Sequence, residues 1–438
     1  MKHRVAFLFL SISITSSAFG QSVLTKSDAL RILMEENFDL KVADLNNEIA
    51  GNNTSFSNSG YLPTLTANGN LNYNLDNSEI SFANGSDTTI NRAASDSRAL
   101  NLNLNYVLFD GFNRKYNISR NRENLTVSQL NAQATLESTL LNFYTLYYAL
   151  AQSQQTLATL KETLSISKDR LTRTQYGFEY GRNTRLDVSN AQVDVNTDSI
   201  NYLNTRQTLE SQIRNLNLIL ALGSEENYKV DTSVVLNEEL DKDALMQALL
   251  TKNAQIQLAK SGVTISQYDD RISQRNYFPT VNLNGGYSNT VNNFAPGNFL
   301  SSRSGNGISY GASFTWNLFD GGVSNTASQN ARVNIGIQKT LLEQTTQEVV
   351  SNFENTWSDF QNRLIIVDAQ RNNQLANQQN FERSLERYRL GRITSLDFRT
   401  AQRNLLQAEI NLIEAKYNAK IAELTLHQLA GEIQQVTF

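Results

Sequence analysis

Two acidic motifs have the residue types and spacing that bear most directly on chemistry, and they repeat within the chain. The first is Gly181 with Thr184-x-x-Asp187, and the second, 210 residues later, is Gly391 with Thr394-x-x-Asp397. Glycine is the usual residue at the left-handed end of a helix, and threonine followed three residues later by an acid is a variant of the capping box that begins the next helix. The aspartates are therefore interpreted first as helix caps. A compatible alternative is that they attract cations.

Residues able to perform catalysis are scarce. The 438-residue chain has no cysteine, which excludes disulfides, thiolate chemistry and Cys-ligated metals. Its two histidines, His3 and His427, leave little for imidazole catalysis or a His-based metal site. We therefore expect no enzyme, no catalytic residue, no metal and no cofactor; an envelope hydrolase is the weakest alternative, because it needs a nucleophile beside a base. A formal net charge of −4 does not favour a nucleic-acid partner.

Residues 1–20 have the features of a secretory signal peptide. Three polar or basic residues, Lys2 to Arg4, precede an apolar run, and Ala18-Phe19-Gly20 offers a small-x-small cleavage site. No later stretch approaches the roughly 18 consecutive apolar residues of a transmembrane helix. If the protein enters a membrane, we expect it to enter as strands.

Helical patterns lead to two equivalent prolines. Apolar residues recur at helical spacing from Thr25 to Gly60, with a break near Glu36-Asn37, and again from Asp243 to Arg275. The first segment ends at Pro63 and the second at Pro279, and proline bars a continuing helix. Each proline is therefore expected to mark the entry to a strand.

After each proline the apolar period changes from helical to alternating. Four alternating segments are expected as strands, at 64–75, 100–108, 281–288 and 308–318, joined in pairs by polar loops at 76–98 and 289–307. Strands of about 9–12 residues with one apolar and one polar face are typical of a water-filled membrane barrel; a sheet on a soluble core is the alternative. Four strands are too few to close a barrel, since about eight is the minimum, so several copies must share one, and three copies would supply twelve strands.

Long helices follow the strands. Asp110-Gly111 and Asp320-Gly321 are expected to begin them, with aspartate as N-cap. The roughly 70 residues between each aspartate and its tip motif would form a helix about 105 Å long. Returning helices are expected over 186–222 and 396–429, and apolar spacings of three and four predict coiled-coil packing. Residues 223–242, acidic and aperiodic, are interpreted as a linker.

Taken together, the signal peptide, the doubled plan, the prolines before strands, the Leu-Phe-Asp-Gly turns and the Gly-x-x-x-x-x-Asp tips, extended to Tyr-x-x-Gly-x-x-x-x-x-Asp in the second repeat, resemble the TolC-like outer-membrane efflux proteins. The resemblance covers about residues 25–430. It implies a mostly α-helical fold with a membrane β-barrel, in which a homotrimer forms twelve strands continuous with a coiled-coil tunnel through the periplasm. It also implies the exit duct of an efflux pump or type I secretion system in the outer-membrane lipid, engaged by a periplasmic adaptor and powered by an inner-membrane transporter of RND or ABC type.

The resemblance divides the chain into nine parts. They are a signal peptide (1–20), periplasmic helices (21–60), a first β-hairpin (61–109), a first long helical hairpin (110–222), an equatorial linker (223–242), a periplasmic helix (243–276), a second β-hairpin (277–319), a second long helical hairpin (320–430) and a tail (431–438).

The resemblance also assigns roles at the tips. The residues expected to meet the adaptor are Gly181, Arg182, Leu186, Tyr388, Gly391, Arg392 and Leu396, while Thr184, Asp187, Thr394 and Asp397 are expected as constriction or cap. Two positions depart from the family pattern. Thr400 stands where a second acidic ring would lie, and Ile393 stands where the family has a latch arginine, with Arg392 one residue earlier. A single acidic ring is therefore the expectation. The main alternative function is a structural or adhesive coiled-coil protein anchored by a barrel; it would not require matching tips.

Overall fold

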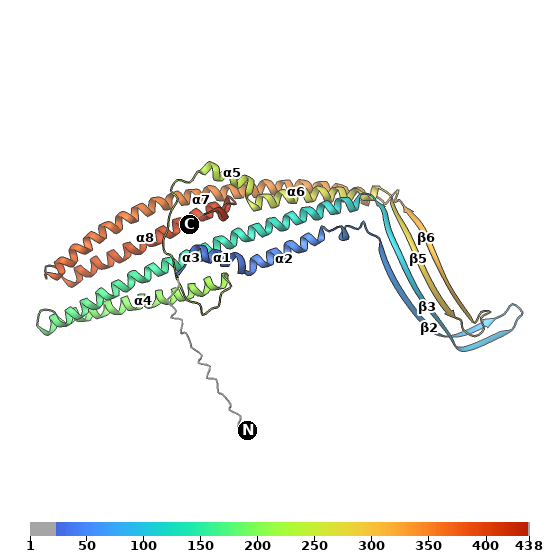
Figure 1. Cartoon of the computed structure of the whole chain (residues 1–438), viewed down its shortest axis with the longest axis horizontal. Helices are drawn as coiled ribbons and strands as arrows, with labels where there is room; N and C mark the ends of the chain where they lie inside the picture. The colour runs from blue at the N-terminus through green and yellow to red at the C-terminus, as the bar shows by residue number, and fades with distance from the viewer. Residues whose placement is uncertain (1–22, 437–438) are drawn as a thin grey trace, which may run out of the picture. The chain divides into compact units, whose positions relative to one another are not determined.

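The computed structural model describes residues 23–436, so the expected signal peptide and Phe438 lie outside the described part (Figure 1). The chain folds into two compact units. The first combines residues up to 41 with 136–249 and those from 352 onward, and the second combines 42–135 with 250–351. No helix among residues 23–436 has the length and apolar character to span a bilayer.

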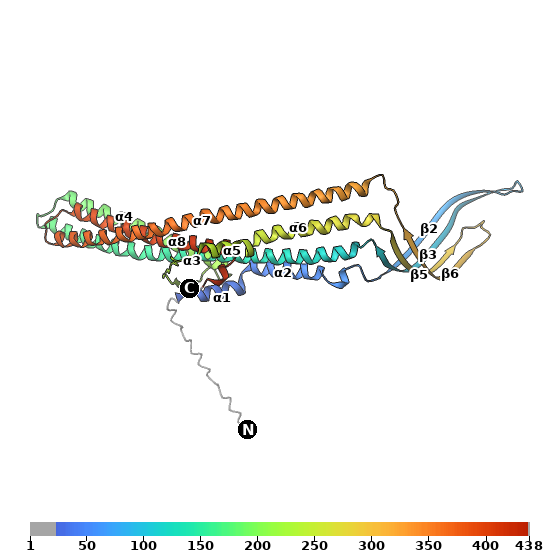
Figure 2. The same cartoon turned by 90° about the horizontal axis from the view of Figure 1, so that it is seen from above.

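The second unit contains one antiparallel sheet. Its strands are β2 (Thr64–Ser81), β3 (Asp87–Asp110), β5 (Thr280–Asn293) and β6 (Ser302–Thr315). Their order is β2-β3-β5-β6 (Figure 2). The two hairpins join through β3 and β5, where Asn101 faces Ser288. Pro63 and Pro279 each precede the first residue of a strand directly, at Thr64 and Thr280.

The expected loops at 76–98 and 289–307 are wrong. Strand pairing continues through most of both segments, so that only 82–86 and 294–301 lie between the paired strands. β6 also ends at Thr315, short of the expected Leu318. The apolar-polar alternation of the sequence is lost in these segments, because polar side chains lie on both faces of the sheet. The backbone hydrogen bonds between the strands do not depend on that alternation, so the pairing continues.

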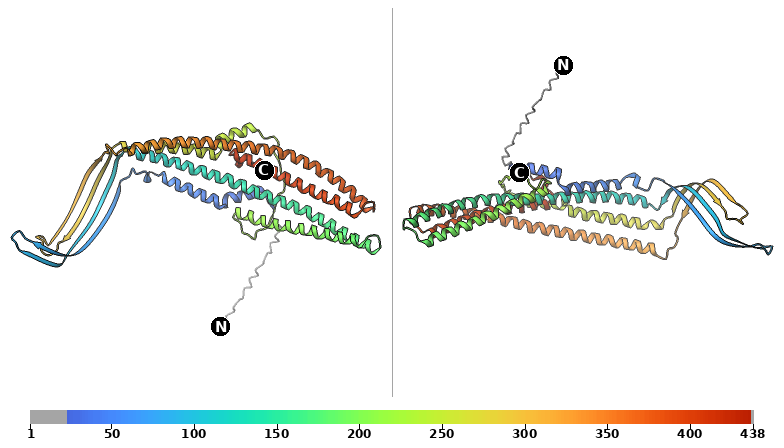
Figure 3. Two further views of the ribbon diagram at one scale, coloured as in Figure 1. Left: turned by 180° about the vertical axis from the view of Figure 1, so that it is seen from behind. Right: turned by 90° about the horizontal axis from the view of Figure 1, so that it is seen from below.

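Four long helices repeat with equal lengths. They are α3 (Asn113–Glu179) and α7 (Val323–Arg389), of 67 residues each, and α4 (Arg185–Ile219) and α8 (Ser395–Leu429), of 35 residues each. Each long helix folds back through a tight turn onto its shorter partner (Figure 3). Asp110 and Asp320 stand three residues ahead of these helices rather than at the N-cap. Their carboxylates nevertheless accept hydrogen bonds from the second helical N–H, Arg114 or Ser324, at 2.9 Å in both cases.

Shorter helices repeat as well, each pair broken at an asparagine. They are α1 (Lys26–Glu36) and α2 (Phe38–Asn53), then α5 (Lys242–Lys252) and α6 (Ala254–Ser273), with 3₁₀ turns at Phe56–Asn58, Gln274–Tyr277 and Ile433–Gln435. The single helix expected over 243–276 is therefore two. Asn253 caps α6 by accepting from the N–H of Ile256 at 3.2 Å, as Asn37 caps α2 by accepting from Leu40 at 3.1 Å.

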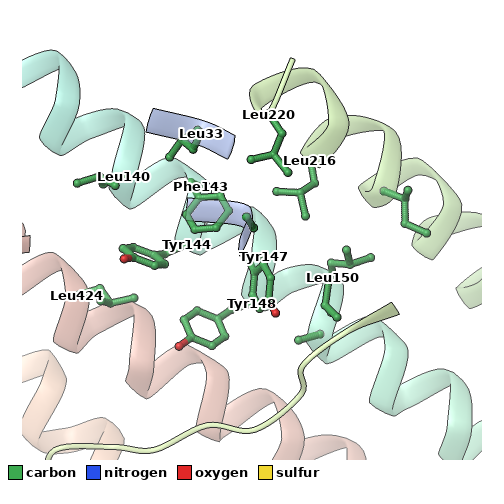
Figure 4. Close-up of a cluster of buried hydrophobic side chains, with 14 of the residues drawn as sticks. Leu33, Leu140, Phe143, Tyr144, Tyr147, Tyr148, Leu150, Leu216, Leu220 and Leu424 are labelled. Atoms are coloured by element: carbon green, nitrogen blue, oxygen red, sulfur yellow. The ribbon is translucent and has the colours of Figure 1, made fainter. Parts of the chain in front are cut away.

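The core of the first unit centres on aromatic residues of α3 (Figure 4). Phe143, Tyr144, Tyr147 and Tyr148 are buried among leucines from α1, α4 and α8. Strand β1 (Val23–Leu24) pairs in parallel with β4 (Lys229–Val230), which belongs to the segment expected as a linker. The Tyr147 hydroxyl donates to the carbonyl of Leu24 at 2.9 Å. This contact holds the start of the described chain against the middle of α3.

Candidate functional site

The turn between α3 and α4 and the turn between α7 and α8 have the same backbone geometry. Gly181 and Gly391 have φ of 69° and 68°, in the left-handed region. The next residue, Arg182 or Arg392, donates its N–H to the carbonyl five residues back, at 2.6 Å and 2.8 Å. Each glycine also donates to the carbonyl three residues back, at 3.0 Å. These are Schellman motifs, and both long helices end in them because glycine pays no Cβ penalty there.

A reciprocal capping box begins the next helix in both turns. The Thr184 N–H donates to Asp187 Oδ2 at 2.8 Å, and the Asp187 N–H donates to Thr184 Oγ1 at 3.2 Å. The same pair of bonds joins Thr394 and Asp397, at 3.2 Å and 3.1 Å. These hydrogen bonds hold the pKa of both carboxyls below their usual value, with Arg387 adding to the effect at Asp397. Both aspartates are therefore ionised helix caps.

The tip residues expected to contact a partner differ in exposure. Leu186 and Leu396 are 68% and 75% exposed, as a docking surface requires. Tyr388 is half-buried and stacks on Phe398 with ring centroids 4.8 Å apart. Ile393, at the position of the family's latch arginine, packs against the apolar cluster that Phe398 forms with Phe381 and Leu405. Its contribution is therefore apolar packing.

A cleft of about 680 Å³ lies between the two turns. Five of the expected tip residues line it: Arg182, Asp187, Tyr388, Gly391 and Thr394. The other six expected tip residues, Gly181, Thr184, Leu186, Arg392, Leu396 and Asp397, are not among its lining residues. Sequence reasoning named Ile393, which also lines the cleft, as a departure from the family pattern. It missed nine others, which are Arg173, Thr174, Tyr176, Gly177, Tyr180, Asn183, Arg389, Leu390 and Ser395. These residues lie within about two helical turns of Gly181 or Gly391, and this proximity is the signal in the sequence that could have identified them.

Sequence reasoning also missed a buried ionic cluster behind the turns. Arg399 of α8 bonds Asp198 of α4 through two nitrogens, at 2.8 Å and 2.7 Å. Its Nε lies 3.3 Å from Asp194, which also pairs with Arg170 of α3. Arg399 and Asp198 are only 7% and 2% exposed. Both helical hairpins are therefore joined by charges that water does not screen.

The cluster breaks the internal repeat. The residues 210 positions from Asp198, Asp194 and Arg399 are Ala408, Asn404 and Ser189, so none of the three has a charged counterpart. Among residues 23–436 the internal repeat therefore has no second copy of this ionic contact, which joins the two hairpins through different residues on each.

Comparisons with known proteins identify the family to which this chain belongs. The model of the family described as "Outer membrane efflux protein" matches residues 29–224 and 245–432. The chain belongs to the outer membrane efflux protein family. It is 21% identical to the outer membrane efflux protein BepC of Brucella suis over 421 residues, covering 94% of this chain and 87% of BepC.

Other members of the outer membrane efflux protein family give the same result. The chain is 21% identical to the outer membrane protein TolC of Escherichia coli, over 80% of this chain and 74% of TolC. Its fold resembles the crystal structure of the CmeC outer membrane channel of Campylobacter jejuni with a TM-score of 0.75 at 16% identity, covering 93% of this chain and 85% of CmeC. The protein is thus an outer-membrane channel that serves efflux, as the sequence resemblance predicts.

Proposed function

We propose that three copies of this chain form one passive exit duct, with a shared twelve-stranded barrel in the outer membrane. A periplasmic adaptor would engage the tip turns, and an inner-membrane transporter of RND or ABC type would supply the energy. An adaptor opens such a duct only if it binds the open arrangement of the tips more tightly than the closed one. The chain itself would catalyse no reaction.

The observation that carries this proposal is the pair of open sheet edges. Within residues 23–436, β2 and β6 each pair with one neighbouring strand only. Alternate residues of both strands expose large apolar side chains, such as Leu71 at 70% and Tyr310 at 92%. A lipid-facing sheet cannot leave its edge amides unpaired, because each would lose its hydrogen bonds to water without replacement. Pairing β6 of one copy with β2 of the next satisfies both edges and keeps the strands antiparallel.

Cross-linking between edge strands tests this arrangement on a sequence that has no native cysteine. Thr66→Cys on β2 would be combined in turn with Gly307→Cys, Ser309→Cys, Gly311→Cys and Ser313→Cys on β6. Within one chain two strands separate these positions, roughly 14 Å at the usual strand spacing, which no disulfide can bridge. A covalent trimer on oxidation of outer membranes, for at least one pair, is the expected result.

A matched control places the second cysteine on an inner strand. Thr66→Cys with Asn284→Cys on β5 keeps the same polar face but should give no product, because β5 is already paired on both sides. Monomer alone in every edge pair would refute the shared barrel. Planar-bilayer conductance of the purified protein separates the duct from a structural or adhesive protein, which would cross-link equally well and conduct no current.

A further inference from the structure

One face of the four-stranded sheet is almost free of charge. The register pairs the strands into transverse rows, and every second row places its side chains on the polar face, opposite to Leu71 and Tyr310. Arg303 is the one charged residue in the polar rows that all four strands share. These rows join Thr64 with Asn105, Asn284 and Gly311; Thr66 with Asn103, Gly286 and Ser309; Asn68 with Asn101, Ser288 and Gly307; Asn70 with Ala99, Thr290 and Gly305; and Asn72 with Ser97, Asn292 and Arg303.

Arg303 stands at the outer end of this face, where the hairpin loops lie rather than α3 and α7. It is the second residue of β6, and its row is the last polar row that all four strands share, because β5 ends at Asn293. On the opposite face the neighbouring row contains Arg98, which pairs with Asp96 at 3.2 Å, so the apolar band ends at the same level. Arg303 therefore lies where the lumen of the proposed barrel opens outward.

The charge of Arg303 has no partner in the part of the chain that the structure describes. Its side chain is exposed, and its guanidinium forms neither an ion pair nor a hydrogen bond there. The next residue on the same face of β6 is Gly305, where even a Cβ would meet no atom within 4 Å. The facing Asn292 accepts instead from the Ser97 hydroxyl, at 2.6 Å. The next acid outward on this face is Asp76, which lies about 14 Å further along β2 than the row of Arg303.

A fixed charge acts most strongly in a lumen that contains no other. Rings of arginine favour anions and rings of acid favour cations. The low-dielectric wall of a channel focuses the field of such a ring into the water that it encloses, which raises the local concentration of counter-ions. Because the neighbouring polar rows supply amides, hydroxyls and glycines, they place no opposite charge within a Debye length, about 10 Å at 0.1 M salt.

We propose that Arg303 sets the charge preference of the outer mouth. Three copies place a ring of three guanidinium groups there, which attracts anions and solutes that carry carboxylate or phosphate groups and repels cations. The inference rests on the proposed shared barrel and adds the class of solute that its mouth favours. The sign of this preference is opposite to that of any ring formed by Asp187 and Asp397 at the tip.

Reversal potentials in planar bilayers test this role. In KCl gradients near 0.1 M, Arg303→Gln should raise the ratio of K⁺ to Cl⁻ permeability about twofold, and the change should vanish near 1 M, where the Debye length is about 3 Å. The matched control, Arg98→Gln, removes the same charge from the neighbouring row on the opposite, apolar face, and should leave the ratio unchanged. An unmoved ratio in Arg303→Gln, or an equal shift in both variants, overturns the inference.

Chemical labelling changes the charge at this position without a further substitution. The natural chain has no cysteine, so Arg303→Cys supplies a single thiol for methanethiosulfonate reagents. A reagent that carries a trimethylammonium group should restore the natural permeability ratio, whereas one that carries a sulfonate should raise it above that of Arg303→Gln. Identical ratios after the two labels would reject the role of Arg303. Absence of current in every variant refutes the duct and this inference with it, whereas normal current with an unmoved ratio rejects the role of Arg303 alone.

Discussion

Arg399 and Asp198 face each other across the two helical hairpins in a bidentate ion pair, with both nitrogen to oxygen distances below 3 Å, at 2.7 Å and 2.8 Å. The two residues are 201 positions apart in the chain. Ser167 and Gln402 complete the cluster, since Arg399 Nη1 donates to each at 3.3 Å. The pair thus fixes the first turns of α8 against α4.

Breaking this pair from one side should loosen the tip. Asp198→Leu leaves the buried guanidinium of Arg399 with the more exposed Asp194 as its remaining ionic partner, and Arg399→Met leaves the buried carboxylate of Asp198 without its arginine. Breaking a buried pair from one side costs about 3–5 kcal/mol. Amide hydrogen exchange over residues 395–405 should accelerate, while exchange near the aromatic core at 143–148 stays unchanged. The double variant, which removes both charges, should exchange more slowly than either single variant.

An exposed ion pair provides the comparison. Arg206 and Glu210 lie 3.2 Å apart on α4 with side chains 56% and 48% exposed. Arg206→Met should change local stability by less than about 0.5 kcal/mol, since surface pairs one helical turn apart contribute little. Equal effects of Arg206→Met and Arg399→Met on exchange would contradict the role assigned to burial.

Gly391 should tolerate asparagine better than alanine. A Cβ at this position meets no atom within 4 Å, so the φ of 68° is the sole source of strain. Gly391→Ala should destabilise the turn by about 1 kcal/mol, and Gly391→Asn by less, because asparagine enters the left-handed region more readily. Exchange of the Arg392 amide, which the Schellman bond protects, reports the difference; identical exchange in both variants would count against it.

Charge and capping at the tip can be separated by two substitutions. Asp187→Asn with Asp397→Asn removes the charge but keeps an oxygen that accepts the N-cap hydrogen bond, whereas the two alanine substitutions remove both. If the aspartates form a cation-attracting ring, both double variants should lower the cation preference measured from reversal potentials in planar bilayers. If they act as caps alone, selectivity stays unchanged, and the alanine variant loses about 1 kcal/mol per turn.

His427 should make the first unit sensitive to mild acid. Burial lowers the pKa of its imidazole, and Lys420 adds to the effect, while Glu423 and Glu432 oppose it. The unfolded chain therefore takes up the proton first as pH falls through 6.5, so stability is full above this value and declines below it. Thermal unfolding at pH 7.5 and 5.5 should show a larger drop in Tm for the natural chain than for His427→Gln; equal drops would reject the assignment.

The strands illustrate where sequence reasoning failed. The alternating pattern located all four strands but ended them too early on the side of the connecting loops. In the first hairpin, residues such as Asn77 and Arg92 interrupt the pattern. In the structure the register shifts between Asp76 and Ser78, and Asn77 Oδ1 accepts from the Arg92 N–H at 2.8 Å. The side chain replaces a ladder bond at this bulge, so pairing resumes beyond it. Apolar periodicity in the sequence therefore cannot predict that the strands continue beyond this register shift.

The sequence alone determined the doubled plan, the strand-entry prolines and the capped glycine turns. Each of these depends on bonds that close within a few residues, as between Thr184 and Asp187, so local spacing is sufficient. Only the tertiary structure decided which charges are buried and which remain free. Arg399 and Asp198 meet across 201 residues, and Arg173 and Arg389 reach one cleft from different helices. Nothing in local spacing distinguishes these arginines, because packing between the hairpins alone removes water from one set and leaves it around the other.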